Sequence, residues 1–155
     1  MKRALPFLFL AATAGCSTNY IPNTDVKDTD DNRSIIRFCE TYRRAVEDKN
    51  VKLLLEMASD RYYEDGGDTK AENDVDYAGL KDYLMTTFQK TAAIRYEVRY
   101  RKVSLSPRQD IYVDYTYSAS YRIPKGTSDE WRHNVADNRI VLTRVGDSYK
   151  ILSGM

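Results

Sequence analysis

The strongest constraint on the fold is a change of hydrophobic period near residue 93. Before it, from Ser34 onward, apolar side chains recur every three or four residues, as on the buried face of a helix. After Ala93 they alternate with polar side chains over long segments, as in strands with one solvent-facing side. Helices followed by antiparallel strands indicate an α+β fold, in which the helices cover one face of the sheet.

Three helices are expected. The first follows the N-cap residue Ser34, the second follows Asn50, and the third begins near Asp76. The breaker at residues 65–68 separates the last two. On the inner face of the first helix lie Ile35, Phe38, Cys39, Tyr42, Ala45 and Val46. Cys39 is therefore expected to be a buried apolar residue instead of a reactive thiol.

Three long strands are expected at about residues 93–105, 111–121 and 131–145. A two-residue hairpin turn at Gly146 leads from the last of them into a short final strand. Val103 and Leu105 are out of phase with the alternation that precedes them. This break predicts a β-bulge near Lys102.

The first sixteen residues have the composition of an export signal. Lys2 and Arg3 form a positive start, residues 5–12 form a short apolar core, and small residues lead to Cys16. The apolar run is too short to span a membrane. The segment resembles a bacterial lipoprotein signal, which implies cleavage after Gly15 and acylation of Cys16.

Acylation of Cys16 would anchor the mature chain, because its lipid chains exceed the two signals that stable membrane attachment takes. Thr13 stands where such signals usually have leucine, and an ordinary secretory leader with an unmodified Cys16 is the alternative. Ser17 after the cysteine favours the outer over the inner membrane, by the same resemblance. We therefore expect a lipid-anchored protein of the cell envelope.

The chain divides into a signal peptide at residues 1–15, a lipidated cysteine with a flexible polar tether at residues 16–33, and one folded domain at residues 34–155. Removal of Lys2 and Arg3 from the 24 basic residues leaves 22, against 23 acidic ones. No nucleic-acid partner is expected, because such proteins carry an excess of basic residues. With Cys16 acylated, Cys39 has no partner for an intramolecular disulfide.

Several segments of the domain together match the pattern of a known family. They are a long first helix with Phe38, Tyr42 and Ala45, a second helix ending at residues 57–60, a helix start at Gly79 and Leu80, the long strands, and the ending at residues 149–154. Over nearly all of residues 34–155 the pattern resembles the nuclear transport factor 2-like (SnoaL-like) superfamily. The resemblance implies a cone-shaped, cystatin-like roll, with three helices in the concave side of a curved antiparallel sheet.

Such a cone normally holds a pocket between its helices and the concave face of the sheet. By the strand alternation, several tyrosines point into it and are the candidate ligand-binding residues. They are Tyr42, Tyr96, Tyr100, Tyr115, Tyr117 and Tyr121. These side chains either bind a small apolar ligand or simply fill the core.

Enzymes of the superfamily, such as ketosteroid isomerase, use an aspartate base, alone or with histidine, and neutral donors that stabilise an enolate. Here the single histidine, His133, is the candidate base, with Asp137 and Asp60 as candidate carboxylates. Asp114 falls on the polar, convex side of its strand. The facing of the strand that contains His133 is ambiguous, because apolar residues occur on both of its sides.

No metal or cofactor is expected, because one histidine and scattered acids give no ligand set with a recognisable spacing. No nucleophile motif is present either. We therefore expect a non-catalytic module that binds a small apolar ligand or an envelope protein. The alternative is a cofactor-free isomerase, cyclase or dehydratase with His133 as its base. Because the convex face is polar, we expect a monomer or a weak dimer.

Overall fold

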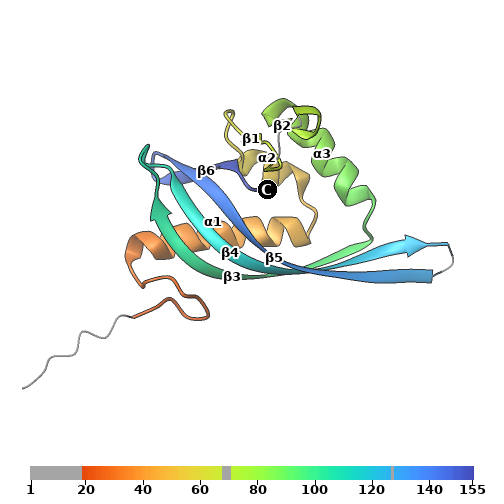
Figure 1. The fold of residues 1–155 in the computed structure, drawn as a ribbon, viewed down its shortest axis with the longest axis horizontal. Coiled ribbons are helices and arrows are strands. Elements are labelled where there is room, and N and C mark those ends of the chain that lie inside the picture. Colours follow the sequence, from red (N-terminus) through yellow and green to blue (C-terminus); the bar gives the residue numbers. More distant parts are fainter. Residues whose placement is uncertain (1–18, 68–70, 127) are drawn as a thin grey trace, which may run out of the picture.

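The computed structural model describes residues 19–67, 71–126 and 128–155. The expected signal peptide, its cleavage point after Gly15 and the lipidation site Cys16 lie outside these residues. Within the described chain, three α-helices precede the strands of the main sheet (Figure 1). The elements are α1 (Asp30–Glu47), α2 (Val51–Met57), β1 (Tyr63–Glu64), the 3-10 helix η1 (Ala71–Asn73), β2 (Val75–Asp76), α3 (Tyr77–Gln89), β3 (Ala93–Leu105), β4 (Ile111–Lys125), β5 (Ser128–Val145) and β6 (Ser148–Ser153).

The main sheet is antiparallel, and its strands lie in the order β3-β4-β5-β6. It is strongly curved, and the helices lie against its concave side (Figure 1). The short strands β1 and β2 form a separate two-stranded ribbon. The predicted α+β fold, with three helices against a curved antiparallel sheet, is confirmed. The register shifts between Tyr100 and Lys102, where the break in alternation predicts a β-bulge.

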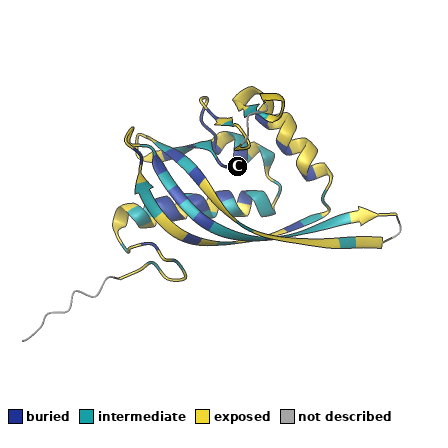
Figure 2. Cartoon of the chain, viewed as in Figure 1, coloured by how far each residue is buried: buried dark blue, intermediate teal, exposed yellow. Residues whose placement is uncertain are grey.

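The core lies between α1 and the concave face of the sheet (Figure 2). Ile35 and Cys39 of α1 are each only 1 % exposed, so Cys39 is the buried apolar residue that the helical period predicts. Burial raises the pKa of its thiol, which keeps the sulfur protonated and unreactive. The other helices and the strands contribute further large side chains, namely Leu54, Leu80, Val113, Ile140, Leu142 and Ile151.

Helix α1 begins at Asp30, which is earlier than the predicted start after Ser34. The N-cap is Thr29, whose hydroxyl accepts a hydrogen bond from the backbone N–H of Asn32 at 3.2 Å. Asp30 and Asp31 occupy the first turn, where negative side chains are favoured by the helix dipole. The prediction that Ser34 caps the helix is wrong because these earlier residues form a better N-terminus.

The prediction of a flexible tether through residue 33 is also wrong from residue 19 onward. Residues 19–28, which we call the N-terminal turn, fold back on themselves, and Tyr20 pairs with Lys27 in an antiparallel bridge. The N–H of Asp25 donates to the carbonyl of Tyr100 in β3 at 2.9 Å, and Val26 is 2 % exposed in the core. The folded part therefore includes the N-terminal turn, which lies at one end of α1 (Figure 1).

Both outer strands of the sheet are partly covered. β3 is covered by the N-terminal turn and by side chains of α1. β6 is covered by the segment after α2. There Ala58 forms a parallel bridge with Ile151, and the N–H of Ser59 donates to the carbonyl of Ile151 at 2.8 Å. No helix among the described residues is long and apolar enough to cross a membrane.

Strands β4 and β5 continue past the beginning of β3 as a two-stranded arm (Figure 1). Trp131 lies at the base of this arm, opposite Arg122, and is 48 % exposed. The Arg95 guanidinium lies 5.0 Å from the centre of the Trp131 ring, within the range of a cation–π contact. The two predicted strands stop short of the arm, at residues 121 and 131, because exposed residues on both faces interrupt the alternation.

Candidate functional site

A cavity of about 240 Å³ lies between the helices and the concave face of the sheet. The helices contribute mainly apolar side chains to it, and the strands contribute aromatic and amide side chains. Its lining consists of Tyr42, Val46, Leu54, Tyr83, Leu84, Thr87, Phe88, Thr91, Ile94, Tyr96, Tyr117, Tyr121, Asn138 and Met155. Its volume is slightly below the range of typical small-molecule sites, so a ligand of one or two rings would fit.

Four of the six candidate tyrosines line this cavity, namely Tyr42, Tyr96, Tyr117 and Tyr121. Tyr115 and Tyr100 lie deeper in the core and are 3 % and 4 % exposed. The Tyr100 hydroxyl donates to Glu40 Oε1 at 3.0 Å and so belongs to the packing between α1 and β3. The tyrosines therefore do both things that the sequence left open: some fill the core and others surround an open space.

Three phenol hydroxyls and one amide form a connected group, which we call the phenol cluster. It consists of Tyr42, Tyr96, Tyr115 and Asn138. The Tyr115 hydroxyl accepts from the Tyr96 hydroxyl at 3.5 Å and from Asn138 Nδ2 at 3.1 Å, and it is also hydrogen-bonded to Tyr42. Burial raises the pKa of Tyr42 and the hydrogen bond that it accepts from Tyr115 lowers it slightly, and Tyr42 is the member of this pair that lines the cavity.

Burial keeps the phenols of this cluster neutral. Desolvation is the main cause that raises the pKa of Tyr42, Tyr96 and Tyr115 above the usual range of a phenol. Nearby tyrosines raise the pKa of Tyr42 and Tyr96 further, because a phenolate there would be repelled by another. At neutral pH these side chains act as hydrogen-bond donors and not as bases.

Tyr96 is held in place by two side chains of α1, Arg43 and Glu47, which we call the edge clamp. Glu47 Oε1 accepts from the Tyr96 N–H at 2.9 Å, and Arg43 Nη1 donates to the Tyr96 carbonyl at 3.0 Å. Arg43 and Glu47 also pair with each other at 2.7 Å. Because β3 is an edge strand, these outward-facing backbone groups have no neighbouring strand, and the edge clamp takes its place.

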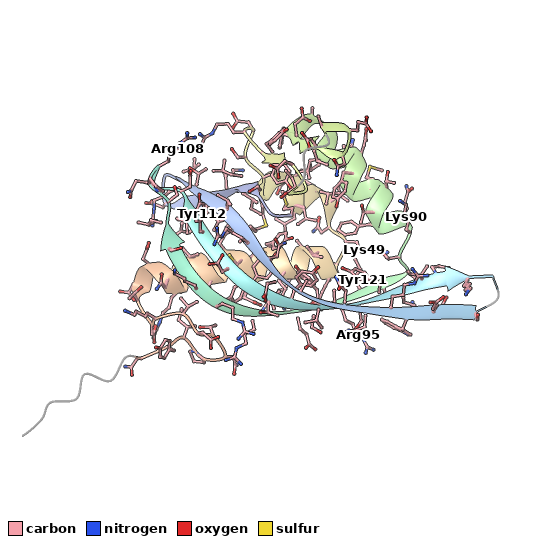
Figure 3. All side chains as sticks on the ribbon, in the orientation of Figure 1. Lys49, Lys90, Arg95, Arg108, Tyr112 and Tyr121 are labelled. Carbon is pink, nitrogen blue, oxygen red and sulfur yellow. The ribbon has the colours of Figure 1, made fainter. Side chains whose placement is uncertain are left out.

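The lining side chains that reach solvent lie on α3 and on the strands that face it, and they mark the open side of the cavity. Tyr83 of α3 is 45 % exposed there, Thr87 and Asn138 are also exposed, and Tyr121 is half-buried. The segment after α3 is fixed there by Lys49, whose Nζ donates to the carbonyl of Thr91 at 2.9 Å. Figure 3 shows Lys49, Lys90 and Tyr121 at this end of the domain. The sequence analysis named no α3 residue as part of the pocket, although Tyr83 and Thr87 adjoin the buried stripe of Leu80, Leu84 and Phe88.

His133 does not lie in the cavity. It is exposed and pairs with Ser120, and its Nδ1 lies 3.1 Å from the Ser120 hydroxyl. Since Tyr121 faces the cavity, Ser120 and His133 face the convex side, where Arg95 also points (Figure 3). The residue of β5 that reaches the cavity is Asn138, which has the opposite parity and which sequence reasoning missed.

The candidate carboxylates are not brought together either. Asp137 lies on the convex face and accepts from the Thr116 hydroxyl at 2.6 Å. Asp60 is exposed after the end of α2, where it accepts from the Ser59 hydroxyl. Asp114 is paired with Arg139 at 2.6 Å on the convex side, as expected. Hence the structure does not bring His133, Asp137 and Asp60 together in the cavity, because strand parity and position separate them from it.

The chemistry of the cavity is that of neutral donors in an apolar space. Its lining contains no carboxylate, imidazole, ammonium or guanidinium side chain among the described residues. Within the same part of the chain, no group of three or more His, Cys, Asp or Glu side chains could hold a metal ion. What the arrangement offers a ligand is a set of oriented hydroxyl and amide groups at one end and an apolar wall at the other.

Comparisons with known proteins give a fold but no close relative. No family model matches the chain, and no curated protein matches it. Among solved structures, it is similar to a protein provisionally named a scytalone dehydratase from Novosphingobium aromaticivorans (11 % identity, TM-score 0.65, 80 % of each chain covered). It is also similar to a provisionally named dehydratase of the NTF2-like family from Streptomyces avermitilis (13 % identity, TM-score 0.62, 80 % of this chain and 93 % of that one).

A third similar structure is a provisionally named aromatic ring hydroxylase from N. aromaticivorans, at 13 % identity and a TM-score of 0.65, covering 81 % of this chain and 86 % of that one. These names correct the interpretation of the domain as a non-catalytic binding or interaction module, because the neighbours are named as enzymes. At these identities the likeness establishes the architecture alone: the described domain has the nuclear transport factor 2-like fold.

Proposed function

We propose that the domain is a cofactor-free enzyme of the dehydratase or isomerase type that acts on a small, neutral, ring-shaped carbonyl compound. The observation that carries the proposal is the phenol cluster: connected hydroxyls on the wall of an otherwise apolar cavity. The names of the similar structures support the same class of reaction.

The cavity lining limits the substrate to an uncharged molecule. A charged group would lose its hydration there and find no side chain of opposite charge in the described lining. The volume of about 240 Å³ suits one or two fused rings. Tyr117 and Phe88 provide aromatic faces against which a flat ring can pack.

The phenol cluster would stabilise an enolate. The Tyr42 hydroxyl donates to the carbonyl oxygen of the substrate, and Tyr96, Tyr115 and Asn138 support it through their hydrogen bonds. The proton on the neighbouring carbon passes to a water molecule at the open mouth. The hydroxyl group on the next carbon then leaves with that proton as water, and a carbon–carbon double bond forms. Donors of this kind typically contribute about 100-fold each to the rate.

The test uses 3-hydroxy-1-tetralone, a neutral two-ring compound whose dehydration and tautomerisation give fluorescent 1-naphthol. The expected result is an enzyme-dependent rise of naphthol fluorescence. Tyr42→Phe removes the donated hydrogen without changing the shape of the cavity, and we expect it to slow the reaction by about 100-fold.

The matched control is Tyr112→Phe, because Tyr112 has a phenol on β4 outside the cavity and packs against Arg139. It should leave the rate unchanged. If neither dehydration nor exchange of the α-hydrogens of 1-tetralone with deuterium occurs, the enzyme proposal fails. If Tyr42→Phe is fully active, the phenol cluster has no catalytic role.

We further propose that the enzyme is held in the cell envelope by acylation of Cys16 after cleavage following Gly15, in the outer rather than the inner membrane. The export signal described above supports this location. Its partners would be the membrane and the small molecule in the cavity, with no nucleic acid, and the chain would be a monomer or a weak dimer. Cys16→Ser should release the protein into the soluble fraction, whereas an ordinary secretory leader would give a soluble protein without this substitution.

A further inference from the structure

The N-terminal turn is bound rigidly to the rest of the domain. Within it, the N–H of Ile21 donates to the carbonyl of Val26, and the N–H of Asp28 donates to that of Asn19, both at 2.9 Å. Asp25 then joins the turn to β3 through ion pairs with Arg99 at 2.6 Å and Arg101 at 2.9 Å. The position of Asn19 is therefore fixed relative to the sheet.

This rigidity shortens the connection to the lipid anchor. Only Ser17 and Thr18 lie between Cys16 and the first residue of the turn, Asn19. Three peptide units span at most about 10 Å. A flexible tether through residue 33 would instead reach about 20 Å on average and let the domain turn freely. With Asn19 so close to an acylated cysteine, the end of the domain that contains the N-terminal turn must lie at the headgroup layer.

The surface at this end suits contact with lipid headgroups. Tyr20 is 54 % exposed and is followed by the exposed Pro22. Tyrosine is favoured at the boundary between headgroups and acyl chains, where its ring and hydroxyl meet different surroundings. Three of the four acidic residues in residues 19–31 are ion-paired, namely Asp25 with two arginines, Asp28 with Arg33 and Asp31 with Arg144. Anionic headgroups would therefore meet little uncompensated negative charge.

The mouth of the cavity lies at the opposite end of α1. The helix begins after Thr29 of the turn and ends at Glu47, and 18 helical residues span about 27 Å. Just beyond its end, Lys49 holds Thr91, which lines the cavity. Figure 1 shows the N-terminal turn and α3 at opposite corners of the domain.

We infer that the N-terminal turn, with Tyr20 at its exposed side, rests on phospholipid headgroups, and that the cavity opens away from the bilayer. The enzyme would then take its substrate from the aqueous phase instead of extracting it from the membrane. This orientation rests on the proposed acylation of Cys16, but it does not depend on which reaction the cavity performs.

The test uses tryptophan fluorescence, because the chain contains a single tryptophan, Trp131. The acylated full-length protein is placed in phosphatidylcholine vesicles that carry a nitroxide on the headgroup. In a Trp131→Phe background, Tyr20→Trp and Tyr83→Trp each supply one probe at an exposed tyrosine position. We expect the probe at position 20 to lose about half of its emission, because the four peptide units to the acylated Cys16 hold it within about 14 Å of the anchor. The probe at position 83 should keep its emission.

A matched variant lengthens the connection by about 12 Gly and Ser residues between Thr18 and Asn19, which restores a flexible tether. It should abolish most of the quenching at position 20. Equal quenching at the two positions without the insertion, or stronger quenching at position 83, would overturn the orientation. The mass of the N-terminal peptide separates the lipid anchor from the orientation. A peptide without acyl chains would overturn both the anchor and the orientation. An acylated peptide, together with equal quenching at the two positions, would overturn the orientation alone.

Discussion

Glu47 of the edge clamp offers a quantitative test of how the phenol cluster is positioned. In Glu47→Ala the Tyr96 N–H loses its acceptor and Arg43 loses one of its two carboxylate partners, while Glu40 at 2.9 Å remains. A hydrogen bond to a charged group contributes about 1.5–3 kcal/mol, and a helical ion pair adds about 0.5 kcal/mol. We therefore expect a loss of about 2.5 kcal/mol in the free energy of unfolding.

Glu47→Gln separates the hydrogen bond from the charge. The amide oxygen of glutamine can still accept from the Tyr96 N–H, so this variant should lose only about 1 kcal/mol. The control is Glu56→Ala, because Glu56 forms an exposed helical ion pair with Lys52 at 3.9 Å and its loss should cost less than about 0.5 kcal/mol. Urea unfolding measures all three, and thermal unfolding should show a fall of about 3 °C for each kcal/mol.

The same variants report on the cavity. If the edge clamp positions Tyr96, Glu47→Ala should also weaken the binding of 1-naphthol, whereas Glu56→Ala should leave the affinity unchanged. A Glu47→Ala protein as stable as the original would show that water satisfies the edge of β3 equally well. A Glu47→Gln protein as unstable as Glu47→Ala would show that the charge, and not the acceptor, holds the strand.

Three other perturbations follow from single residues. Gly154→Ala should destabilise the domain severely or prevent folding, because the φ of Gly154 is +93° and a Cβ atom would lie 2.1 Å from the carbonyl oxygen of Arg139. Circular dichroism and urea unfolding would detect this loss, and a stable variant would contradict the geometry. Leu142→Ala should lower the free energy of unfolding by about 3–5 kcal/mol, because Leu142 is 0 % exposed. A loss below about 1.5 kcal/mol in urea unfolding would mean that the core collapses around the missing side chain. Hydrogen bonds from Arg99 and Arg101 lower the pKa of Asp25 to about 2, below its value in the unfolded chain, so its stabilising effect should be complete above about pH 4 and should fade as the pH drops toward 2. A carboxyl NMR titration of Asp25 with a midpoint near 4 would disprove the pairing, and Asp25→Asn should remove the acid-dependent part of the stability.

Sequence patterns predicted the architecture because local periodicity reports which face of an element is buried. The stripe of Leu80, Leu84 and Phe88 and the alternation after Ala93 depend only on neighbours in the chain. The resemblance to a known superfamily then supplied the curvature and the concave tyrosines. The fold and part of the cavity wall were therefore accessible without coordinates.

The N-terminal turn and the facing of β5 were not accessible, for two different reasons. The turn is ordered by contacts such as that of Asp25 with Arg99, which is 74 residues away and leaves no mark on a local pattern. In the outer part of β5, side chains on both faces meet solvent, so Trp131 and Val135 are exposed although they are apolar. Alternation then carries no information about the side that faces the cavity, which is why Asn138 was missed and the facing of His133 stayed ambiguous.

The covered edges of the sheet would matter if the protein is anchored to a membrane surface, as proposed above. Molecules confined to two dimensions collide often, and a bare edge strand could pair with that of a neighbour and begin aggregation. Here the outward backbone groups of Tyr96 are taken by the edge clamp and the carbonyl of Tyr100 by Asp25, while Ser59 covers the Ile151 carbonyl on β6. These contacts would thus limit the joining of sheets between copies that the proposed anchor brings side by side.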